Sequence, residues 1–286
     1  MEGSVHSNRW EQEAQFFDAQ AAAHLQRPEP IDPSIVARYE APGRLFAKEY
    51  CCRFLGNLED KLVLDFGCGE GDDALLLASL GARVTAIDIS PKAIEFARVR
   101  AEMSGVASRI TFVCAPIEAA ELPAGHFDVI WGDNILHHVL PVLDETLAAL
   151  MRAAKPGAQV VFNEPVVLNR LLRRIRLFVP VHTDTTPGER PLEPSDIEII
   201  RRHIPAVKNR YFRCFARLAR LFVRCQQLET ASPFQRALTK MFAATDYFLL
   251  SLPGIERLAG VGVFYGRAPL AFEREEGVAS NVLSVA

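Results

Sequence analysis

Residues 63–78, with the sequence VLDFGCGEGDDALLLA, decide the fold of this chain. The first four residues form a short, largely apolar run that suits a buried strand of a parallel sheet. A glycine loop follows at 67–71, and residues 74–80 favour a helix. Glycines at alternate positions allow a sharp turn and let a ligand approach the backbone with no Cβ in the way. The stretch therefore predicts a strand, a ligand-binding loop and a helix.

Acidic residues around this loop indicate the charge of the ligand. Asp65 precedes the glycines, Glu70 lies among them, and Asp72 and Asp73 follow. These carboxylates would disfavour a pyrophosphate at the start of the helix, because two unit charges ~4 Å apart interact by ~4 kcal/mol at an effective dielectric constant of ~20. A cationic ligand is therefore favoured over a dinucleotide.

The strand and loop resemble the first motif of the class I S-adenosylmethionine-dependent methyltransferases, in which an acid stands two residues before a G-x-G-x-G loop. S-adenosylmethionine carries a sulfonium and an ammonium group, which matches the acidic loop. The alternatives are an NAD site and a purely structural turn. The resemblance covers roughly residues 60–165 and implies S-adenosylmethionine as the cofactor. In this motif the implied cofactor contacts are Asp65, Gly67, Cys68, Gly69 and Gly71.

A second strand, predicted over 83–89, carries an acid 21 residues after Gly67. An acid ~20 residues beyond a glycine loop, at the tip of the next strand, can accept hydrogen bonds from ribose hydroxyls. We therefore expect Asp88, with Ile89 beside it, to bind the cofactor. Ser90 and Pro91 supply an N-cap and a first-turn proline for the helix that follows.

The turn after the third strand, predicted over 110–115, departs from the family pattern. The family usually presents an acid to the adenine amino group at this turn, whereas this chain has Pro116. Ile117 can still pack on the ring, and Glu118 or a backbone carbonyl can accept from the amine. Pro116, Ile117 and Glu118 are therefore among the expected cofactor contacts.

The run FDVIWGDNILHH at 127–138 resembles the family's fourth motif and adds Asp133 and Asn134 as implied cofactor contacts. His137 and His138 follow this predicted strand, and Glu164 follows the fifth strand, predicted over 159–162. A histidine oriented by a carboxylate can serve as a general base near neutral pH, and similar natural-product O-methyltransferases can use such a pair. We expect His137, His138 and Glu164 to be catalytic. Simple packing or capping is the alternative, and periodicity does not choose between the histidines.

Composition narrows the class of protein. The chain has 286 residues, of which 49% are hydrophobic and 23% charged, as in ordinary globular proteins. No apolar run approaches the ~20 residues that span a bilayer, and no basic segment followed by an apolar one begins the chain. Six cysteines show neither a C-x-x-C spacing nor a histidine pattern for zinc. We therefore expect no metal and a reducing, cytoplasmic location.

Positive charge is concentrated in residues 166–225, which hold 13 Lys and Arg against 5 Asp and Glu. Residues 170–178 form one basic amphipathic piece. A second is a stripe formed by Arg213, Arg217, Arg220 and Arg224, if that stretch is helical. Such helices suit an anionic membrane surface or an anionic substrate, and a solvated helix face is the plainer interpretation. Nucleic acid is not expected, because stacking aromatics and an overall basic charge are missing.

The predicted fold is α/β, a doubly wound Rossmann-like seven-stranded sheet with a helical cap. Residues 210–215 and 261–265 are the expected last two strands, which close the sheet in antiparallel fashion, and Ser195 is the expected cap of an intervening helix. The expected divisions are an N-terminal helical lid at 1–58, a cofactor-binding core at 59–165, a cap segment at 166–207, the end of the sheet with a helical insertion at 208–270, and a loose tail at 271–286. By resemblance, Phe17 and Tyr39 are candidate lid contacts.

The predicted function is methylation of a fairly hydrophobic small molecule. Oxygen is the preferred acceptor atom, because an alcohol or phenol must lose a proton and therefore needs a base. One alternative is carbon methylation of a quinone or lipid headgroup at a membrane surface. Another is a module that binds the cofactor without turning it over. The sequence leaves the substrate, the methylated atom and the oligomeric state open.

Overall fold

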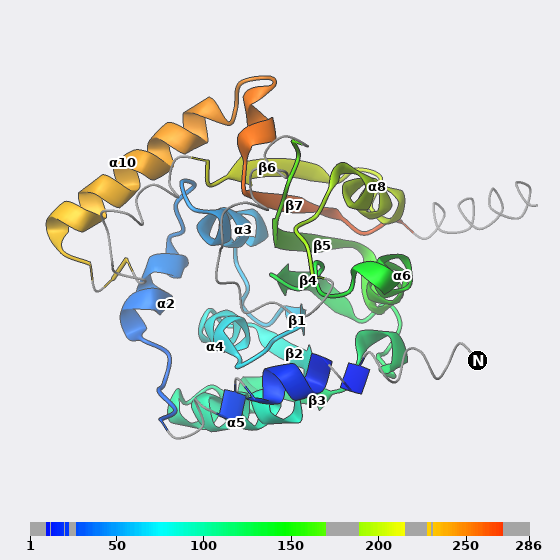
Figure 1. The fold of residues 1–286 in the computed structure, drawn as a ribbon. Helices are drawn as coiled ribbons and strands as arrows, with labels where there is room; N and C mark the ends of the chain where they lie inside the picture. Colours follow the sequence, from blue (N-terminus) through cyan, green and yellow to red (C-terminus); the bar gives the residue numbers. More distant parts are fainter. Residues whose placement is uncertain are drawn as a thin grey trace, which may run out of the picture.

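A seven-stranded sheet forms the centre of the molecule (Figure 1). The structure is a computed structural model, and it describes residues 10–11, 13–19, 21–22, 27–169, 189–214, 228–229 and 231–270. The strand order is β3-β2-β1-β4-β5-β7-β6. The strands are β1 (Leu62–Phe66), β2 (Arg83–Asp88), β3 (Ile110–Cys114), β4 (Phe127–Asp133), β5 (Ala154–Pro165), β6 (Lys208–Phe212) and β7 (Val261–Arg267).

The direction of the strands confirms the predicted sheet. β1 to β5 pair in parallel, and β7 runs antiparallel to both β5 and β6. β1 lies between β2 and β4, so the chain order reverses there. Ligands of such sheets bind outside the carboxyl ends of the strands at this reversal. The topology therefore directs attention to the loops after β1 and β4.

Helices cover both faces of the sheet. The α-helices are α2 (Pro33–Glu40), α3 (Ala47–Leu55), α4 (Asp72–Ser79), α5 (Pro91–Met103), α6 (Leu143–Ala153), α8 (Pro194–His203) and α10 (Pro233–Leu249). Short 3-10 turns lie at Ala107–Arg109, Ile117–Ala119, Leu140–Val142 and Ile255–Leu258. Residues of α3, α4 and α5 form one core cluster with the sheet, and residues of α6 and α8 form the other (Figure 1).

Burial on both faces explains the apolar first strand. Val63 belongs to the cluster under α4 and Leu64 to the cluster under α6, and both are fully buried. Successive side chains of a strand point to opposite faces, so a strand covered on both sides is apolar at consecutive positions. β1 is thereby fixed in the middle of the sheet, and the glycine loop begins where it ends.

Two helix starts show how local sequence sets the boundaries. The Ser90 side chain accepts a hydrogen bond from Ala93 N, and Pro91 begins α5, as predicted. The prediction of Ser195 as a cap is wrong, because α8 already begins at Pro194 and Glu193 is its N-cap residue. Glu193 N donates to the Asp196 carboxylate at 2.7 Å, which closes a capping box that the sequence analysis missed.

The last strands differ from the predicted bounds. β6 ends at Phe212, and Arg213 has a φ of 61°, which is incompatible with a helix that begins there. Arg213 is therefore not the first residue of a helical arginine stripe. Arg217, Arg220, Arg224, residues 170–178 and residues 271–286 lie outside the described residues. Among the helices that the structure describes, none has the length and apolar character needed to cross a membrane.

Candidate functional site

A cavity of about 380 Å³ lies at the carboxyl ends of β1, β2 and β4. Its wall includes Phe66 at the end of β1, Ile87 at the end of β2, Ala115 after β3 and Ile135 after β4. Eight of the predicted cofactor contacts line it, namely Gly67, Gly69, Asp88, Ile89, Pro116, Ile117, Glu118 and Asn134. The loops of four separate strands thus bring most of the predicted set around one space.

The backbone of β2 and the Asp88 side chain hold the glycine loop. Gly67 N and Cys68 N both donate to the Ile87 carbonyl, at 2.9 and 3.0 Å. The Asp88 carboxylate accepts from Gly69 N at 2.8 Å and from Ser90 N at 2.9 Å. Burial raises the pKa of Asp88, and these backbone donors oppose that shift. Asp88 therefore fixes the loop and still offers further acceptor capacity at the cavity wall.

Gly67 is required by space as well as by conformation. Its φ is 72°, and a Cβ added there would lie 2.3 Å from the Ile135 side chain. The loop after β1 and the loop after β4 therefore approach each other closely at this point. Any larger residue at position 67 would push Ile135, which is itself part of the cavity wall.

Four predicted cofactor contacts do not line the cavity. Asp65 is buried beneath the loop, its Oδ2 has no hydrogen-bond partner among the described residues, and burial raises its pKa well above the usual range. Cys68 is also buried. Gly71 is the N-cap residue of α4, where a Cβ would lie 2.8 Å from that of Ala97. Asp133 forms an ion pair with Lys48 at 2.8 Å.

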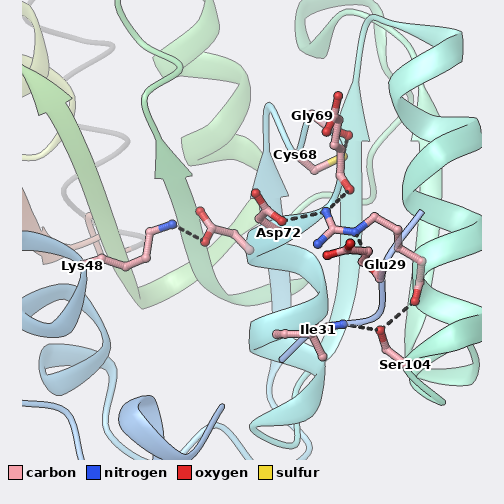
Figure 2. A network of polar contacts seen from close by, with 10 residues as sticks. Glu29, Ile31, Lys48, Cys68, Gly69, Asp72 and Ser104 are labelled. Atoms are coloured by element: carbon pink, nitrogen blue, oxygen red, sulfur yellow. Dashed lines mark hydrogen bonds and ion pairs between the residues drawn. The ribbon is translucent and has the colours of Figure 1, made fainter. Parts of the chain in front are cut away.

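The acids that follow the loop are paired with cations, which corrects the electrostatic argument made from the sequence. Figure 2 shows Asp72 in contact with a guanidinium, and this group is that of Arg100 at 2.6 Å. Lys48 lies 2.7 Å from Asp73, whose other oxygen accepts from Trp131 Nε1 at 3.0 Å. Burial raises the pKa of Asp73 to about 6, and Lys48 opposes the shift. Neither Asp72 nor Asp73 lines the cavity, whereas Glu70, which belongs to the loop, does.

Arg100 also joins the loop to the segment before α2. Its guanidinium donates to the carbonyl of Glu70 and to the carbonyl of Glu29, both at 3.0 Å (Figure 2). Close by, Ile31 N donates to Ser104 Oγ at 2.9 Å. The end of α5 thus holds the glycine loop and the chain that leads into α2 in a fixed relation.

The two histidines have different partners. His137 Nδ1 lies 2.8 Å from Glu164 Oε2, and the other oxygen of Glu164 accepts from the backbone N–H groups of Ile135 and Leu136. Glu164 is fully buried. Glu164 and His137 therefore hold the loop after β4 in place. The contact between a histidine and Glu164 is the one that the sequence predicts.

His138 lines the cavity, and His137 is not part of the cavity wall. His138 Nδ1 lies 2.7 Å from Glu189 Oε1, and the Phe17 ring packs edge-on against the imidazole at 5.3 Å. Burial lowers the pKa of His138, the neighbouring His137 lowers it further, and Glu189 opposes both. His138 is therefore neutral near pH 7, with a carboxylate at one ring nitrogen.

The N-terminal helical residues cover the cavity. Trp10, Glu13, Phe17 and Ala21 contribute to its wall, and the Asp18 carboxylate accepts from Ser90 Oγ at 2.6 Å and from Lys92 N at 3.0 Å. The structure thus places Phe17 where a lid contact was predicted. The prediction for Tyr39 is wrong, because Tyr39 lines a separate cavity of about 510 Å³ with Leu58 and Gly81.

Comparison with known proteins identifies the family to which the central part of the chain belongs. The family model described as "Methyltransferase domain" matches residues 63–157, which include β1 from its second residue, β2 to β4 and the start of β5. Residues 63–157 form a class I S-adenosylmethionine-dependent methyltransferase domain. The predicted family is thereby confirmed, together with the cofactor on which that family depends.

Relatives of the methyltransferase domain include two curated proteins. The mitochondrial ubiquinone biosynthesis O-methyltransferase of Schizosaccharomyces pombe is 37% identical over 133 residues, which cover 44% of this chain and 48% of that protein. The ubiquinone biosynthesis O-methyltransferase of Thiobacillus denitrificans is 42% identical over 122 residues, which cover 43% and 50%. The chain thus spans about half the length of these relatives.

A solved structure supports the methyltransferase fold over a longer part of the chain. Phosphoethanolamine N-methyltransferase 2 of Haemonchus contortus matches with a TM-score of 0.53 and 15% identity, and the match covers 91% of this chain and 59% of that one. At this identity the similarity concerns the fold alone. It agrees with the seven-stranded sheet described above.

The methyltransferase domain and its flanking segments bring one further set of ligating groups together. Among the described residues, a nitrogen each of His137 and His138 and an oxygen of Glu189 lie within 4.8 Å of one another. Nitrogen and carboxylate ligands at such separations suit a divalent transition metal. The expectation of no metal stays a prediction.

Several residues of the site, Glu13 among them, were missed by the sequence analysis. Glu189 lies 51 positions after its partner His138, and Lys48 and Trp10 come from the N-terminal helices. No spacing or periodicity links any of them to the methyltransferase motifs. Glu189 belongs to the segment PGERPLEP, whose composition predicts a loop. Nothing in that composition indicates that the loop contacts the residues after β4.

Proposed function

We propose that this chain is an S-adenosylmethionine-dependent O-methyltransferase that acts on a fairly hydrophobic small molecule, with His138 as the general base. The observation that carries the proposal is the contact of the cavity-lining His138 with Glu189. The O-methyltransferases among its relatives support oxygen as the acceptor. Because the chain spans about half of those relatives, the activity and the substrate class are proposals for this protein.

The cavity suits the adenosine part of the cofactor. Asp88 would accept from the ribose hydroxyls, since each carboxylate oxygen can accept more than one hydrogen bond. Ile89 and Ile117 offer apolar surface to the adenine ring, and Trp10 would cover it. Asp65 lies under the loop and would act through the loop backbone.

For the adenine amino group, the N-terminal helix offers a replacement for the acid that the family has at position 116. Glu118 Oε1 already accepts from Thr146 Oγ1 at 2.8 Å, which holds that carboxylate toward α6. Glu13 also lines the cavity. We assign the amino contact to a carboxylate of the cavity wall, Glu13 or Glu118, because each carboxylate oxygen can accept more than one hydrogen bond.

The chemistry needed from the protein is limited. The bound cofactor would supply an activated methyl group on a sulfonium, so the protein must align the acceptor oxygen and exclude water. The substrate hydroxyl proton passes to His138 Nε2 as the new oxygen–carbon bond forms. The proton already on Nδ1 stays in the hydrogen bond to Glu189, which stabilises the imidazolium that results.

His137 has a different part in this proposal. Its partner Glu164 holds the backbone of Ile135 and Leu136, and these residues precede His138 in the same loop. His137 and Glu164 would therefore act as positioning residues that set the place of His138. The two histidine–carboxylate pairs divide the roles between support and proton transfer.

The proposal is tested with S-adenosylmethionine whose methyl group carries carbon-13. The protein is incubated with a set of catechols and hydroxylated quinones, and the methyl resonance of each product shows whether the label is on oxygen or carbon. A methoxy product that depends on His138 supports the proposal. A carbon-methylated product would favour carbon methylation, and cofactor binding without any product would favour a binding module.

Membrane contact through the arginine-rich segments belongs to the carbon-methylation alternative. Most of those arginines lie outside the described residues, and Arg213 is not helical. No observation on the described residues therefore favours that alternative over oxygen methylation.

A further inference from the structure

Asp65 is a buried acid to which the proposed reaction gives no chemical step. It lies in β1, two residues before Gly67, and its exposed fraction is 1%. Among the described residues, its Oδ2 has no hydrogen-bond partner. An ionised carboxylate that is buried without a donor loses its hydration and gains no hydrogen bond in return. The position of Asp65 therefore favours the protonated, neutral form of its side chain.

The charged groups that interact with Asp65 come from four elements of the fold. Burial is the largest cause of its raised pKa. Asp73 of α4, Asp133 of β4 and Asp88 of β2 raise the pKa of Asp65 further, and Lys48 of α3 lowers it. Three negative charges thus oppose one positive charge, so the surroundings do not compensate a carboxylate at this position.

The other three acids have donors that favour their ionised form. Lys48 Nζ lies 2.7 Å from Asp73 (Figure 2) and 2.8 Å from Asp133, and two backbone N–H groups donate to Asp88. Asp65 has no contact of this kind at Oδ2 in the part of the chain that the structure describes. Of these four acids, Asp65 is therefore the one that holds a proton before the cofactor binds.

The cofactor brings positive charge within reach of Asp65. Asp88 lines the cavity and raises the pKa of Asp65, so Asp65 responds to charge at the cavity wall. A cation at that wall has the opposite effect and favours the carboxylate. S-adenosylmethionine carries a sulfonium and an ammonium, whereas none of the described residues of the wall is Lys or Arg. The bound cofactor would therefore supply the charge that Asp65 needs to ionise.

We propose that the binding of S-adenosylmethionine releases a proton from Asp65. The O–H bond of the Asp65 carboxyl group breaks, its electron pair remains on the carboxylate, and the proton passes to the solvent, while the cofactor keeps its own charges. A ligand that binds with release of a proton binds more tightly as the pH rises. The inference rests on the cofactor of the family, and it is independent of the acceptor atom and of the base in the proposed function.

Other titratable groups near the loop are distinguished by pH. Burial lowers the pKa of His138 below 6.5 and raises that of Asp73 only to about 6, so both are largely deprotonated near pH 7. Burial raises the pKa of the Cys68 thiol well above its usual range, so Cys68 keeps its proton. Proton release near pH 7 therefore reports on Asp65. Turnover at saturating cofactor does not depend on this affinity, and its pH dependence still follows His138.

Calorimetry near pH 7 counts the protons. The full chain is titrated with S-adenosylmethionine, without a methyl acceptor, in buffers of different ionisation enthalpy, and the slope of the observed enthalpy against the buffer enthalpy gives the number released. We expect roughly one proton, and a Kd that falls by up to about tenfold for each pH unit between about pH 6 and pH 7. Release of no proton, or a Kd that does not change with pH, would overturn the proposal. Intact release in a protein that yields no methoxy product would contradict the proposed function alone.

5′-Methylthioadenosine tests the role of the positive charge. This ligand has the adenosine part of the cofactor and a neutral thioether, and it lacks both the sulfonium and the ammonium. We expect it to bind without proton release and with a Kd that changes by less than about twofold over the same pH range. Equal release by both ligands would contradict the proposal, because release would then not depend on the charge of the cofactor.

Asp65→Asn assigns the proton to its residue. Asparagine has the shape of the protonated acid and no proton to release, so we expect no release and a Kd for S-adenosylmethionine that is independent of pH. Asp72→Asn is the matched control, because the same change on an exposed side chain at the start of α4 should leave the release intact. Thermal melting checks that both variants fold. Release that persists in Asp65→Asn would reject Asp65 as its source.

Infrared difference spectra give a second measurement on the unmodified protein. A protonated carboxyl group has a C=O stretching band that a carboxylate lacks. We expect this band to disappear when S-adenosylmethionine is added and to remain when 5′-methylthioadenosine is added. A band that the cofactor leaves unchanged would also overturn the proposal.

Discussion

Nδ1 of His138 lies 2.7 Å from Oε1 of Glu189, so the loop after β4 is joined to the segment that leads into α8. His137 in the same loop uses its own Nδ1 on Glu164. Two adjacent histidines are therefore each held by a separate buried carboxylate, and their ring centroids lie 4.1 Å apart. This arrangement explains why only one of them lines the cavity.

Loss of His138 should remove the base without affecting the cofactor. We expect His138→Ala to lower kcat by roughly 100- to 10,000-fold, the usual contribution of general base catalysis, and Glu189→Gln to lower it less. Cofactor affinity, measured by calorimetry, should stay within about twofold. The control is His126→Ala, since His126 is exposed and packs edge-on against Phe127. Full activity of both His138→Ala and Glu189→Gln would exclude this base.

The pH dependence should follow the lowered pKa of His138. A base must be neutral to accept a proton, so kcat/KM should be level near pH 7 and decline only when the pH falls below 6.5, the ordinary histidine value. Glu189 raises the pKa of His138, so Glu189→Gln should move the acidic limb to still lower pH. A decline that begins above pH 7 in the unmodified protein would contradict the assignment.

Asp88 should control cofactor affinity. Asp88→Ala removes an acceptor at the cavity wall and the hydrogen bond that holds Gly69 of the loop, so we expect the Kd for S-adenosylmethionine to rise by about tenfold or more. Asp72→Asn is the control, because the Asp72 side chain is 77% exposed and does not line the cavity. Calorimetric titration measures both. Equal affinities for Asp88→Ala and the unmodified protein would remove Asp88 from the site.

Arg100 should contribute more to stability than its ion pair suggests. Arg100→Met leaves the carbonyls of Glu29 and Glu70 without their donor, and we expect it to lower the free energy of unfolding by about 1–3 kcal/mol. Asp72→Asn removes only an exposed ion pair and should lower it by less than about 1 kcal/mol. Urea denaturation compares the two. The interpretation fails if both variants lose the same amount.

The residues that sequence could predict are those whose partners are close in the chain. The loop at 67–71 and Asp88 are set by one strand-helix-strand unit, and the bond from Gly69 N to Asp88 joins residues 19 apart. Glu189, Glu13 and Lys48 reach the site only after the whole sheet has formed, because each lies on a segment outside β1 to β5. Their roles depend on tertiary packing, which neither periodicity nor motif spacing records.

The sign of the charges after the loop was visible in the sequence, but their partners were not. Asp72 and Asp73 begin α4 and are neutralised by Arg100 of α5 and Lys48 of α3. The preference for a cationic ligand therefore depends on Glu70 and Asp88 at the cavity wall. The order of glycines and acids is specific to the family and predicts it correctly. The charges of Asp72 and Asp73 do not contribute to that preference, because both are paired with cations.

The hydrogen bonds of Asp18 to Ser90 and Lys92 have a kinetic consequence. They attach the N-terminal helical residues to the start of α5, two residues beyond Asp88, so both must break before these residues can move off the cavity. At about 0.5–1.5 kcal/mol for each net hydrogen bond, the closed state would outnumber the open one by roughly 5- to 150-fold. We therefore expect these bonds to slow exchange of the spent cofactor, and Asp18→Ala to speed that exchange.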